Sequence, residues 1–177
     1  GDYAAARPPL ERSLQILERA NGPNHPTVAN RLSHLAEFLV RTGDYAAARP
    51  LYERALRIYE QTDPSNPNVP AILNNLAEVL GLTGDYAGAR PLHERALRRL
   101  EELYGPNHTH VAQSLNDFAG LLRLRGDYAA AKLLVERALR IFEGVVGPNH
   151  PWVAESLNNL AELQRLTGDY VAAQSLH

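Results

Sequence analysis

Cysteine and methionine are both absent from the 177 residues, and tryptophan occurs only once. The absence of cysteine excludes disulfide bonds, thiolate metal sites and a cysteine nucleophile. No apolar run approaches the roughly 20 residues that a membrane-spanning helix needs, and no signal peptide is visible. The sequence therefore predicts a cytoplasmic protein that does not interact with membranes.

An excess of charge of one sign is also lacking, because the formal net charge is only −2 at pH 7. Nucleic-acid-binding surfaces usually carry a basic excess, so this balance argues against a nucleic-acid partner. His108 and His110 are two residues apart, a spacing that does not share a helix face, and the other histidines are spread along the chain. The sequence shows no nucleophile beside a base and no phosphate-binding glycine loop. We therefore expect no bound metal, no cofactor and no enzymatic activity.

What the chain does contain is one segment repeated at a nearly fixed step. The segment reads GDYAAARPLYERALRIYE from Gly43 and recurs, with changes, from Gly1, Gly84, Gly126 and Gly168. Self-similarity at a step of 41 or 42 residues predicts a repeat array, in which the core is buried between neighbouring repeats. Because the sequence begins and ends inside a repeat, we interpret it as a piece of a longer protein.

Each repeat contains two helical segments. The apolar residues between positions 28 and 39 fall at steps of three and four, which predicts an amphipathic helix over Pro26–Arg41, here called helix A. Gly43 is predicted to form a left-handed turn, and Asp44 to cap a second helix, helix B, over Tyr45–Glu60. Two helices joined by so short a turn must lie antiparallel, so each repeat is predicted to be a helical hairpin.

The other copies follow the same plan. The later helices A are predicted at Pro67–Leu82, Thr109–Arg125 and Pro151–Leu166, and the helices B that follow them begin near Tyr86, Tyr128 and Tyr170. In the GPNH linker that precedes helix A, the histidine is expected to cap the helix, as Asn66 is in the second repeat: His25, His108 and His150. The predicted division is an orphan helix B at 1–20, hairpins at 22–62, 63–104 and 105–146, and a hairpin at 147–177 that is truncated in helix B.

The repeated motifs also resemble a known family. Gly-Asp-Tyr followed by alanines, the segments ILNNLAEV (Ile72–Val79) and SLNNLAEL (Ser156–Leu163), and the LYERAL of helix B resemble the tetratricopeptide repeat. The longer unit and the GPNHP linker resemble the kinesin light chain-like form of that repeat. The resemblance implies an all-α fold, an α-solenoid that is a right-handed superhelix of antiparallel helical hairpins. It also implies that helices A line a concave groove and that helices B lie outside it.

On this arrangement, one flank of helix A faces the groove and supplies the candidate binding residues. That flank carries an asparagine in three repeats (Asn74, Asn116 and Asn158), and a carboxamide can both donate to and accept from a peptide backbone. The resemblance implies this role most directly for Asn74 and Asn158, with Asn75 and Asn159 adjacent to them. The remaining candidates on this flank are Ser33, Glu37, Glu78, Glu162, Arg123 and Arg165. Alternatively, the asparagines bond within the stack and hold neighbouring helices in register, and the glutamates pair with the arginines.

The sequence thus predicts a protein–protein interaction scaffold that binds a peptide or partner segment in the helix A groove. The alternative is a self-assembly module, because repeat arrays need polar caps and neither terminal helix has one. Uncapped terminal helices would dock on a second molecule and give a homo-oligomer, either a dimer or an open head-to-tail filament. The identity of the protein or peptide partner does not follow from the sequence.

Overall fold

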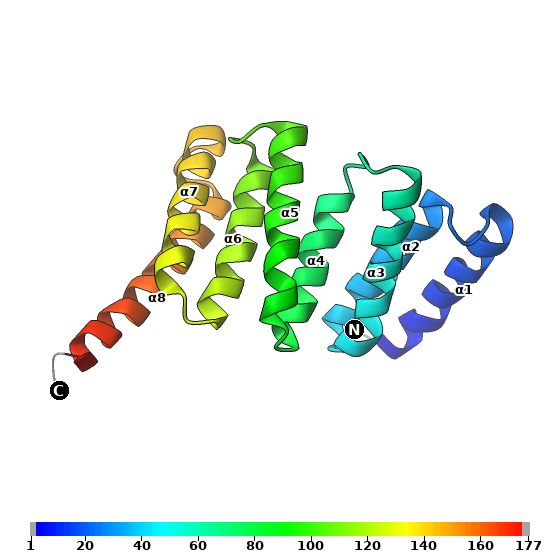
Figure 1. The fold of residues 1–177 in the computed structure, drawn as a ribbon, viewed down its shortest axis with the longest axis horizontal. Helices are drawn as coiled ribbons and strands as arrows, with labels where there is room; N and C mark the ends of the chain where they lie inside the picture. Colours follow the sequence, from blue (N-terminus) through cyan, green and yellow to red (C-terminus); the bar gives the residue numbers. More distant parts are fainter. Residues whose placement is uncertain (1–2, 175–177) are drawn as a thin grey trace. The chain divides into compact units, whose positions relative to one another are not determined.

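The computed structural model describes residues 3–174, and every regular element in that range is an α-helix (Figure 1). The helices are α1 (Tyr3–Asn21), α2 (Pro26–Arg41), α3 (Tyr45–Thr62), α4 (Val69–Leu82), α5 (Tyr86–Tyr104), α6 (Thr109–Leu124), α7 (Tyr128–Val146) and α8 (Pro151–Gln174). The chain forms two compact units, Gly1–Leu92 and His93–His177. The predicted all-α solenoid of successive antiparallel helices is confirmed.

The turn between helix A and helix B is built as the sequence predicts. Gly43 has a φ of +81°, a left-handed conformation that glycine adopts without steric cost. Its neighbour Asp44 donates its backbone N–H to the Leu39 carbonyl at 2.9 Å, and its side chain accepts from the Ala47 N–H at 3.2 Å. The glycine therefore ends α2, and the aspartate begins α3.

The linker histidines cap helix A, as predicted. The Nδ1 atom of His25 accepts from the Thr27 N–H at 3.2 Å, and that of His108 accepts from the His110 N–H at 3.1 Å. In the same way, the Nδ1 atom of His150 accepts from the Trp152 N–H at the start of α8, at 3.2 Å. Each bond satisfies one of the backbone donors that a helix N-terminus leaves without an intrahelical partner.

The start of α4 differs from the prediction, which placed it at Pro67. The Asn66 side chain does accept from the Asn68 N–H at 2.9 Å, but residues 67–68 form a turn and the helix begins at Val69. In α2, the N–H four residues after the cap bonds to the cap carbonyl, from Ala29 to His25 at 3.3 Å. The equivalent residue in α4 is Pro70, which has no N–H, so this first helical bond does not form.

The end of α8 is the second difference. We expected helix A to end at Leu166 and a turn at Gly168, but α8 is one helix from Pro151 to Gln174. Gly168 therefore lies within a helix, where each added residue gains one backbone hydrogen bond, whereas Gly43, Gly84 and Gly126 have positive φ and lie in turns. The last three residues of the expected helix B lie outside the described range. At the end of α6 the difference is smaller, since the helix stops at Leu124, one residue before the predicted end.

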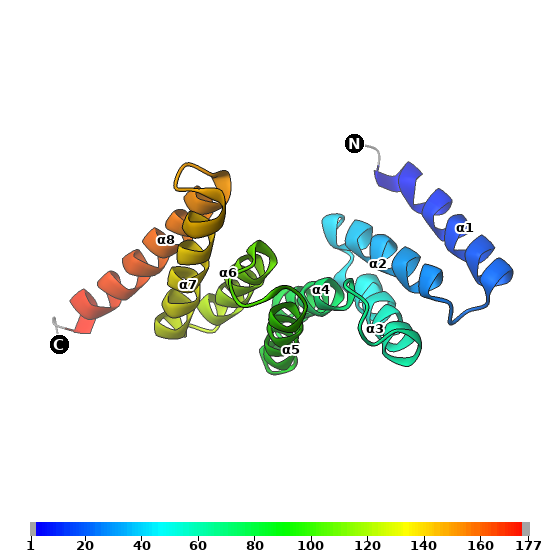
Figure 2. The same ribbon diagram turned by 90° about the horizontal axis from the view of Figure 1, so that it is seen from above.

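Within each unit, the core lies between successive helices. In the first unit, α2 packs against α1 and α3, and α4 packs against α3; in the second, α7 packs against α6 and α8 (Figure 2). One buried cluster in the second unit joins four helices through Leu100, Val111, Ala112, Leu115, Ala138, Ile141, Phe142 and Val153. Alanines such as Ala36, Ala48 and Ala138 are fully buried, which allows the close approach of helices that the sequence predicts. The cluster in the second unit thus extends beyond one hairpin, as expected for a repeat array.

Candidate functional site

Two helices A and the helix B between them enclose a pocket of about 110 Å³ in the second unit. The pocket is lined by Asn116, Ala119, Gly120 and Arg123 of α6, Val135 of α7, and Asn159, Glu162 and Leu163 of α8. Four of the groove residues predicted from the sequence are therefore brought together here: Asn116, Arg123, Asn159 and Glu162. The floor, Val135, comes from helix B and is 1% exposed.

Asn116 is the most deeply placed polar residue of this pocket, with only 6% of its surface exposed. Its Nδ2 donates to the hydroxyl of Ser156 on α8 at 2.9 Å, whereas its Oδ1 is buried and accepts no hydrogen bond. The nitrogen thus performs the structural role considered as the alternative, joining one helix A to the next. The oxygen is an acceptor without a donor, a state that costs about 1–3 kcal/mol when water is excluded.

The pocket is lined by two charged side chains, Arg123 and Glu162. Glu162 pairs with Arg165 at 3.2 Å, so one of the predicted glutamate–arginine pairs is formed. The hydrogen bond and the charge of Arg165 hold the pKa of Glu162 below its ordinary value, and the charge of Arg123 lowers it further. In α6, Gly120 occupies the position that Glu162 has in α8, and Arg123 adds a positive charge to the pocket edge.

The equivalent position in the first unit has a different character. There the floor is Tyr52 of α3, which is 1% exposed and shares a hydrogen bond with the Asn75 side chain. The amide of Asn75 also donates to Glu37 at 3.5 Å. Burial raises the pKa of Tyr52 well above its usual range, and the nearby charges of Glu37 and then Glu78 contribute to the rise. This surface is therefore acidic, whereas the pocket in the second unit is lined by one positive and one negative side chain, Arg123 and Glu162.

The remaining predicted residues lie outside these two clusters or on their edges. Ser33 is buried and donates to the Ala29 carbonyl of its own helix at 3.0 Å. Asn74 is half-buried on α4, and Asn158 is exposed on α8, although both occupy the position of Asn116 in their repeats. At this position, Asn116 bonds to a neighbouring helix A through Ser156 of α8.

The residue of helix B that forms the floor was not among the predicted site residues. It is Tyr52 in LYERAL and Val135 in LVERAL; the equivalent residue of LHERAL is His93, and all three are at most 2% exposed. The signal was present in the sequence, because this is the only letter that varies among these three copies of the motif. His93 stacks on Phe118 with the ring centroids 5.3 Å apart, and burial lowers its pKa to about 4. At pH 7 the imidazole is therefore neutral.

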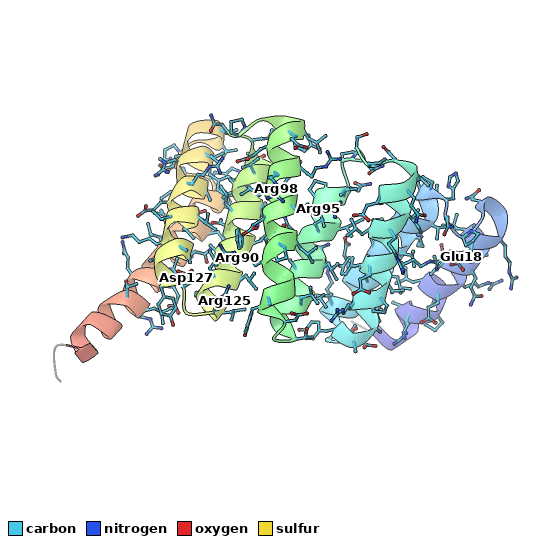
Figure 3. All side chains as sticks on the ribbon, viewed as in Figure 1. Glu18, Arg90, Arg95, Arg98, Arg125 and Asp127 are labelled. Carbon is cyan, nitrogen blue, oxygen red and sulfur yellow. The ribbon has the colours of Figure 1, made fainter. Side chains whose placement is uncertain are left out.

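A second residue of the same motif holds successive repeats together. Arg54 donates to the Glu18 carboxylate at 2.6 Å and to the Pro23 carbonyl at 2.9 Å, and Figure 3 labels Glu18 on α1. In the second unit Arg137 makes the same pair of bonds, to Glu101 at 2.6 Å and to the equivalent linker carbonyl at 3.3 Å. The arginine of ERAL therefore clamps the linker and the preceding helix B.

Two classes of site are not found among the described residues. No helix in residues 3–174 combines the length and the apolar character needed to cross a bilayer. The same residues contain no group of three or more histidine, aspartate or glutamate side chains placed to hold a metal ion.

Comparisons with known proteins agree with this architecture. A family model described as tetratricopeptide repeat matches residues 1–61, 68–144 and 134–177. No curated protein gives a significant match to the sequence.

Several solved structures are similar to this chain. One is BtubC (BKLC) from P. vanneervenii, at 25% identity and a TM-score of 0.84, covering 99% of this chain and 70% of that one. Another contains the nearly identical TPR-like repeats of a kinesin light chain-like protein from Podosopora anserina, at 22% identity and a TM-score of 0.81, covering 99% and 84%. The apo form of RapI shares the fold at 16% identity and a TM-score of 0.80, covering 98% and 61%. The chain belongs to the tetratricopeptide repeat family, and its structural neighbours are kinesin light chain-like repeat proteins.

Proposed function

We propose that this chain is a protein-interaction module that binds an extended peptide segment along its helices A, with the pocket between α6 and α8 as the main point of contact. Repeats of the family generally mediate protein–protein interaction. The observation that carries the proposal is the buried Oδ1 of Asn116, which accepts no hydrogen bond and belongs to a residue that lines a pocket. A backbone N–H of a bound peptide supplies the missing donor.

The size of the pocket favours a peptide over a small molecule. Sites for drug-sized ligands usually enclose roughly 300–1,000 Å³, whereas this pocket holds about 110 Å³. It therefore has room for one side chain of a ligand whose remaining contacts lie outside it. Val135 and Leu163 provide apolar surface for that side chain, and Asn116 and Asn159 provide amides beside it.

The charged residues around the pocket determine which peptide residues are favoured beside the bound side chain. The charges of both Arg123 and Arg165 act on Glu162, and Arg123 lines the pocket, so an acidic residue of the peptide is favoured at the second unit. Arginine engages a carboxylate through two parallel hydrogen bonds, which makes it well suited to this role. At the first unit, Glu37 and Glu78 beside Tyr52 favour a basic residue instead.

Panning a displayed library of random linear peptides against the whole chain tests this function. The selected peptides are then measured against Asn116→Leu, which removes the acceptor, and Arg123→Glu, which reverses the charge at the pocket edge. We expect each variant to lose about tenfold in affinity, the value of one hydrogen bond or ion pair of about 1.4 kcal/mol. Peptides with an acidic residue should be enriched.

Two matched variants separate binding from folding. Ser156→Ala breaks the bond to the Asn116 nitrogen but keeps the Oδ1 acceptor, so it should keep peptide affinity. Arg125→Glu reverses an exposed charge just beyond the end of α6 and outside the pocket, and it should bind like the parent chain. Equal loss of affinity in Asn116→Leu and Ser156→Ala would show that the pocket supports the fold and not the ligand.

A further inference from the structure

The solvent-facing side of α7 carries an open hollow of about 570 Å³ that the proposed function does not use. It is lined by Asn107, from the linker between α5 and α6, and by Arg137, Arg140, Ile141, Gly144 and Val145 of α7. Residues 137, 140, 141 and 144 recur at steps of three and four, so they form one face of the helix. Val135, the floor of the pocket between α6 and α8, lies on the opposite face of α7 by the same spacing. The hollow and the pocket therefore share no residue.

Gly144 opens this hollow. The other repeats have a long polar side chain at the same position, such as Gln61 on α3 and Glu102 on α5. A Cβ added at Gly144 meets no atom within 4 Å, and its φ is not positive, so neither close packing nor a turn requires glycine there. Within a helix, glycine is less favourable than alanine because it loses more conformational freedom on folding. What glycine does provide is a stretch of backbone that a bound chain can approach closely.

The lining of the hollow is positively charged. Two arginines line it, and no acidic residue of the described range does. Arg137 is bonded to Glu101 at 2.6 Å, whereas Arg140 is exposed and makes no ion pair with any residue from 3 to 174. Glu136, one turn before Arg140, pairs with Lys132 at 3.8 Å instead. The guanidinium group of Arg140 is therefore available to a ligand.

Helices that follow in the array leave this surface open. Arg57 on α3 has the position of Arg140 and is exposed, although α4 follows it in the same unit. Leu103 on α5 has the position of Val145 and is 39% exposed, although α6, α7 and α8 follow it. The hollow therefore belongs to the outer face of a helix B and results from the side chains of α7 itself.

We propose that this hollow is a second protein-binding site, which takes an acidic segment of a partner protein. A carboxylate of the segment pairs with Arg140 through two parallel hydrogen bonds and accepts from the side-chain amide of Asn107. An apolar side chain beside it in the partner covers Ile141 and Val145 and lies over the backbone of Gly144. The site shares no residue with the peptide-binding pocket proposed above and does not rest on it.

The size and the open shape of the hollow favour a protein segment over a small molecule. Its volume of about 570 Å³ lies within the range of roughly 300–1,000 Å³ that drug-sized ligands fill, but such ligands are buried over most of their surface. A small molecule in this hollow would remain exposed to solvent on one side. A protein segment places two neighbouring side chains in the hollow and makes its remaining contacts on the surface around it.

Subtractive panning isolates ligands of the hollow. A displayed library of random linear peptides is first depleted on Gly144→Gln and then selected on the parent chain. Glutamine is the residue that α3 has at this position, so it occupies the hollow without changing the pocket between α6 and α8. Peptides that remain after both steps need the hollow in order to bind. We expect them to carry an acidic residue beside a large apolar one.

The affinities of the selected peptides for further variants identify the contacts. Arg140→Glu should weaken binding about tenfold or more, because it places like charges opposite one another. Replacing the acidic residue of the peptide by lysine should restore binding to this variant. Gly144→Ala adds one methyl group in open space and should bind like the parent, which separates occupation of the hollow from helix stability. Arg57→Glu, the same substitution on α3, is the matched control and should change nothing.

The fold should remain intact in all these variants, because Arg57, Arg140 and Gly144 are exposed, and thermal unfolding followed by circular dichroism checks this. The selected peptides should bind Asn116→Leu as tightly as the parent, so a failure of the inner pocket leaves this test unaffected. Failure to enrich any peptide after the depletion step would overturn the proposal. So would selected peptides that bind Arg140→Glu as tightly as the parent, or that lose affinity for Asn116→Leu instead.

Discussion

The side-chain amide of Asn116 donates to the hydroxyl of Ser156 at 2.9 Å, and both residues are more than nine-tenths buried. This bond joins α6 to α8, which are two successive helices A. It fixes the register of the two helices and holds the side chain of Asn116, which lines the pocket. The structural and the proposed binding roles of this asparagine therefore depend on one side-chain orientation.

The bond should be measurable as a coupling between the two side chains. Ser156→Ala leaves the Asn116 nitrogen buried without an acceptor and should lower the free energy of unfolding by about 1–3 kcal/mol. In a double-mutant cycle with Asn116→Leu, urea unfolding should give a coupling of about 0.5–1.5 kcal/mol. Strictly additive losses would show that the two side chains do not interact in solution. Ser65→Ala, in an exposed turn, is the control and should cost little.

The two glycines Gly43 and Gly168 stand in the same sequence motif but should respond oppositely to alanine. Gly43 has a φ of +81°, so Gly43→Ala should destabilise the fold by about 1–2 kcal/mol. Gly168 lies inside α8, and no atom stands within 4 Å of an added Cβ. Gly168→Ala should therefore raise helix stability by about 0.5–1 kcal/mol. Thermal unfolding of the two variants checks both signs, and destabilisation by Gly168→Ala would argue for a turn at that residue.

His93 should make stability depend on pH in the acidic range. Its pKa is about 4 in the folded chain because the imidazole is buried, while an unfolded histidine titrates near 6.5. The unfolded state therefore binds a proton first, so the contribution is complete above about pH 6.5 and is lost as the pH falls toward 4. The loss amounts to about 3 kcal/mol for a shift of this size.

The control for this pH effect is His93→Phe, which keeps an aromatic ring beside Phe118 and has no titrating group. Its free energy of unfolding, followed by urea titration between pH 7 and 4, should fall by less than that of the parent chain. Parallel curves for the two proteins would place the pH dependence elsewhere.

Arg54 should stabilise the joint between repeats more than its exposed neighbours on α3. Arg54→Gln removes the bonds to Glu18 and to the Pro23 carbonyl, and we expect a loss of about 0.5–1.5 kcal/mol that becomes smaller at high salt. Arg57→Gln is the matched control, since Arg57 is exposed on the same helix and makes no ion pair in the described structure. Chemical unfolding at low and high salt gives the free energy of unfolding of Arg54→Gln and of Arg57→Gln under each condition. A loss equal to that of the control would mean that the clamp contributes nothing.

The helices could be read from the sequence because their signals are local. Gly43, Asp44 and the capping histidines act within a few residues of their own position, and the structure confirms each of them. One of the wrong helix boundaries has a cause that a repeat pattern hides, because Pro70 removes one N–H from a helix whose other copies keep it. The continuation of α8 through Gly168 does not follow from the motif, which forms a turn at Gly43.

The candidate site was only partly predictable. Helix periodicity, with the arrangement that the resemblance implies, predicts a flank of helix A that faces the groove; of the candidate residues, Asn116, Arg123, Asn159 and Glu162 line one pocket. It does not reveal which atom of an amide is already bonded, because the partner Ser156 lies forty positions away in the sequence. The floor residue on helix B was missed for a similar reason, since its apolar or aromatic character is equally consistent with an ordinary core position.

The most direct test of the proposed site is the NMR signal of the Asn116 side-chain amide during titration with a peptide selected on the parent chain. Our account predicts that this signal and the methyl signals of Val135 shift together, while the methyls of Leu133, exposed on the same helix as Val135, stay unchanged. A peptide that binds and shifts Leu133 while leaving Asn116 and Val135 unperturbed would contradict it.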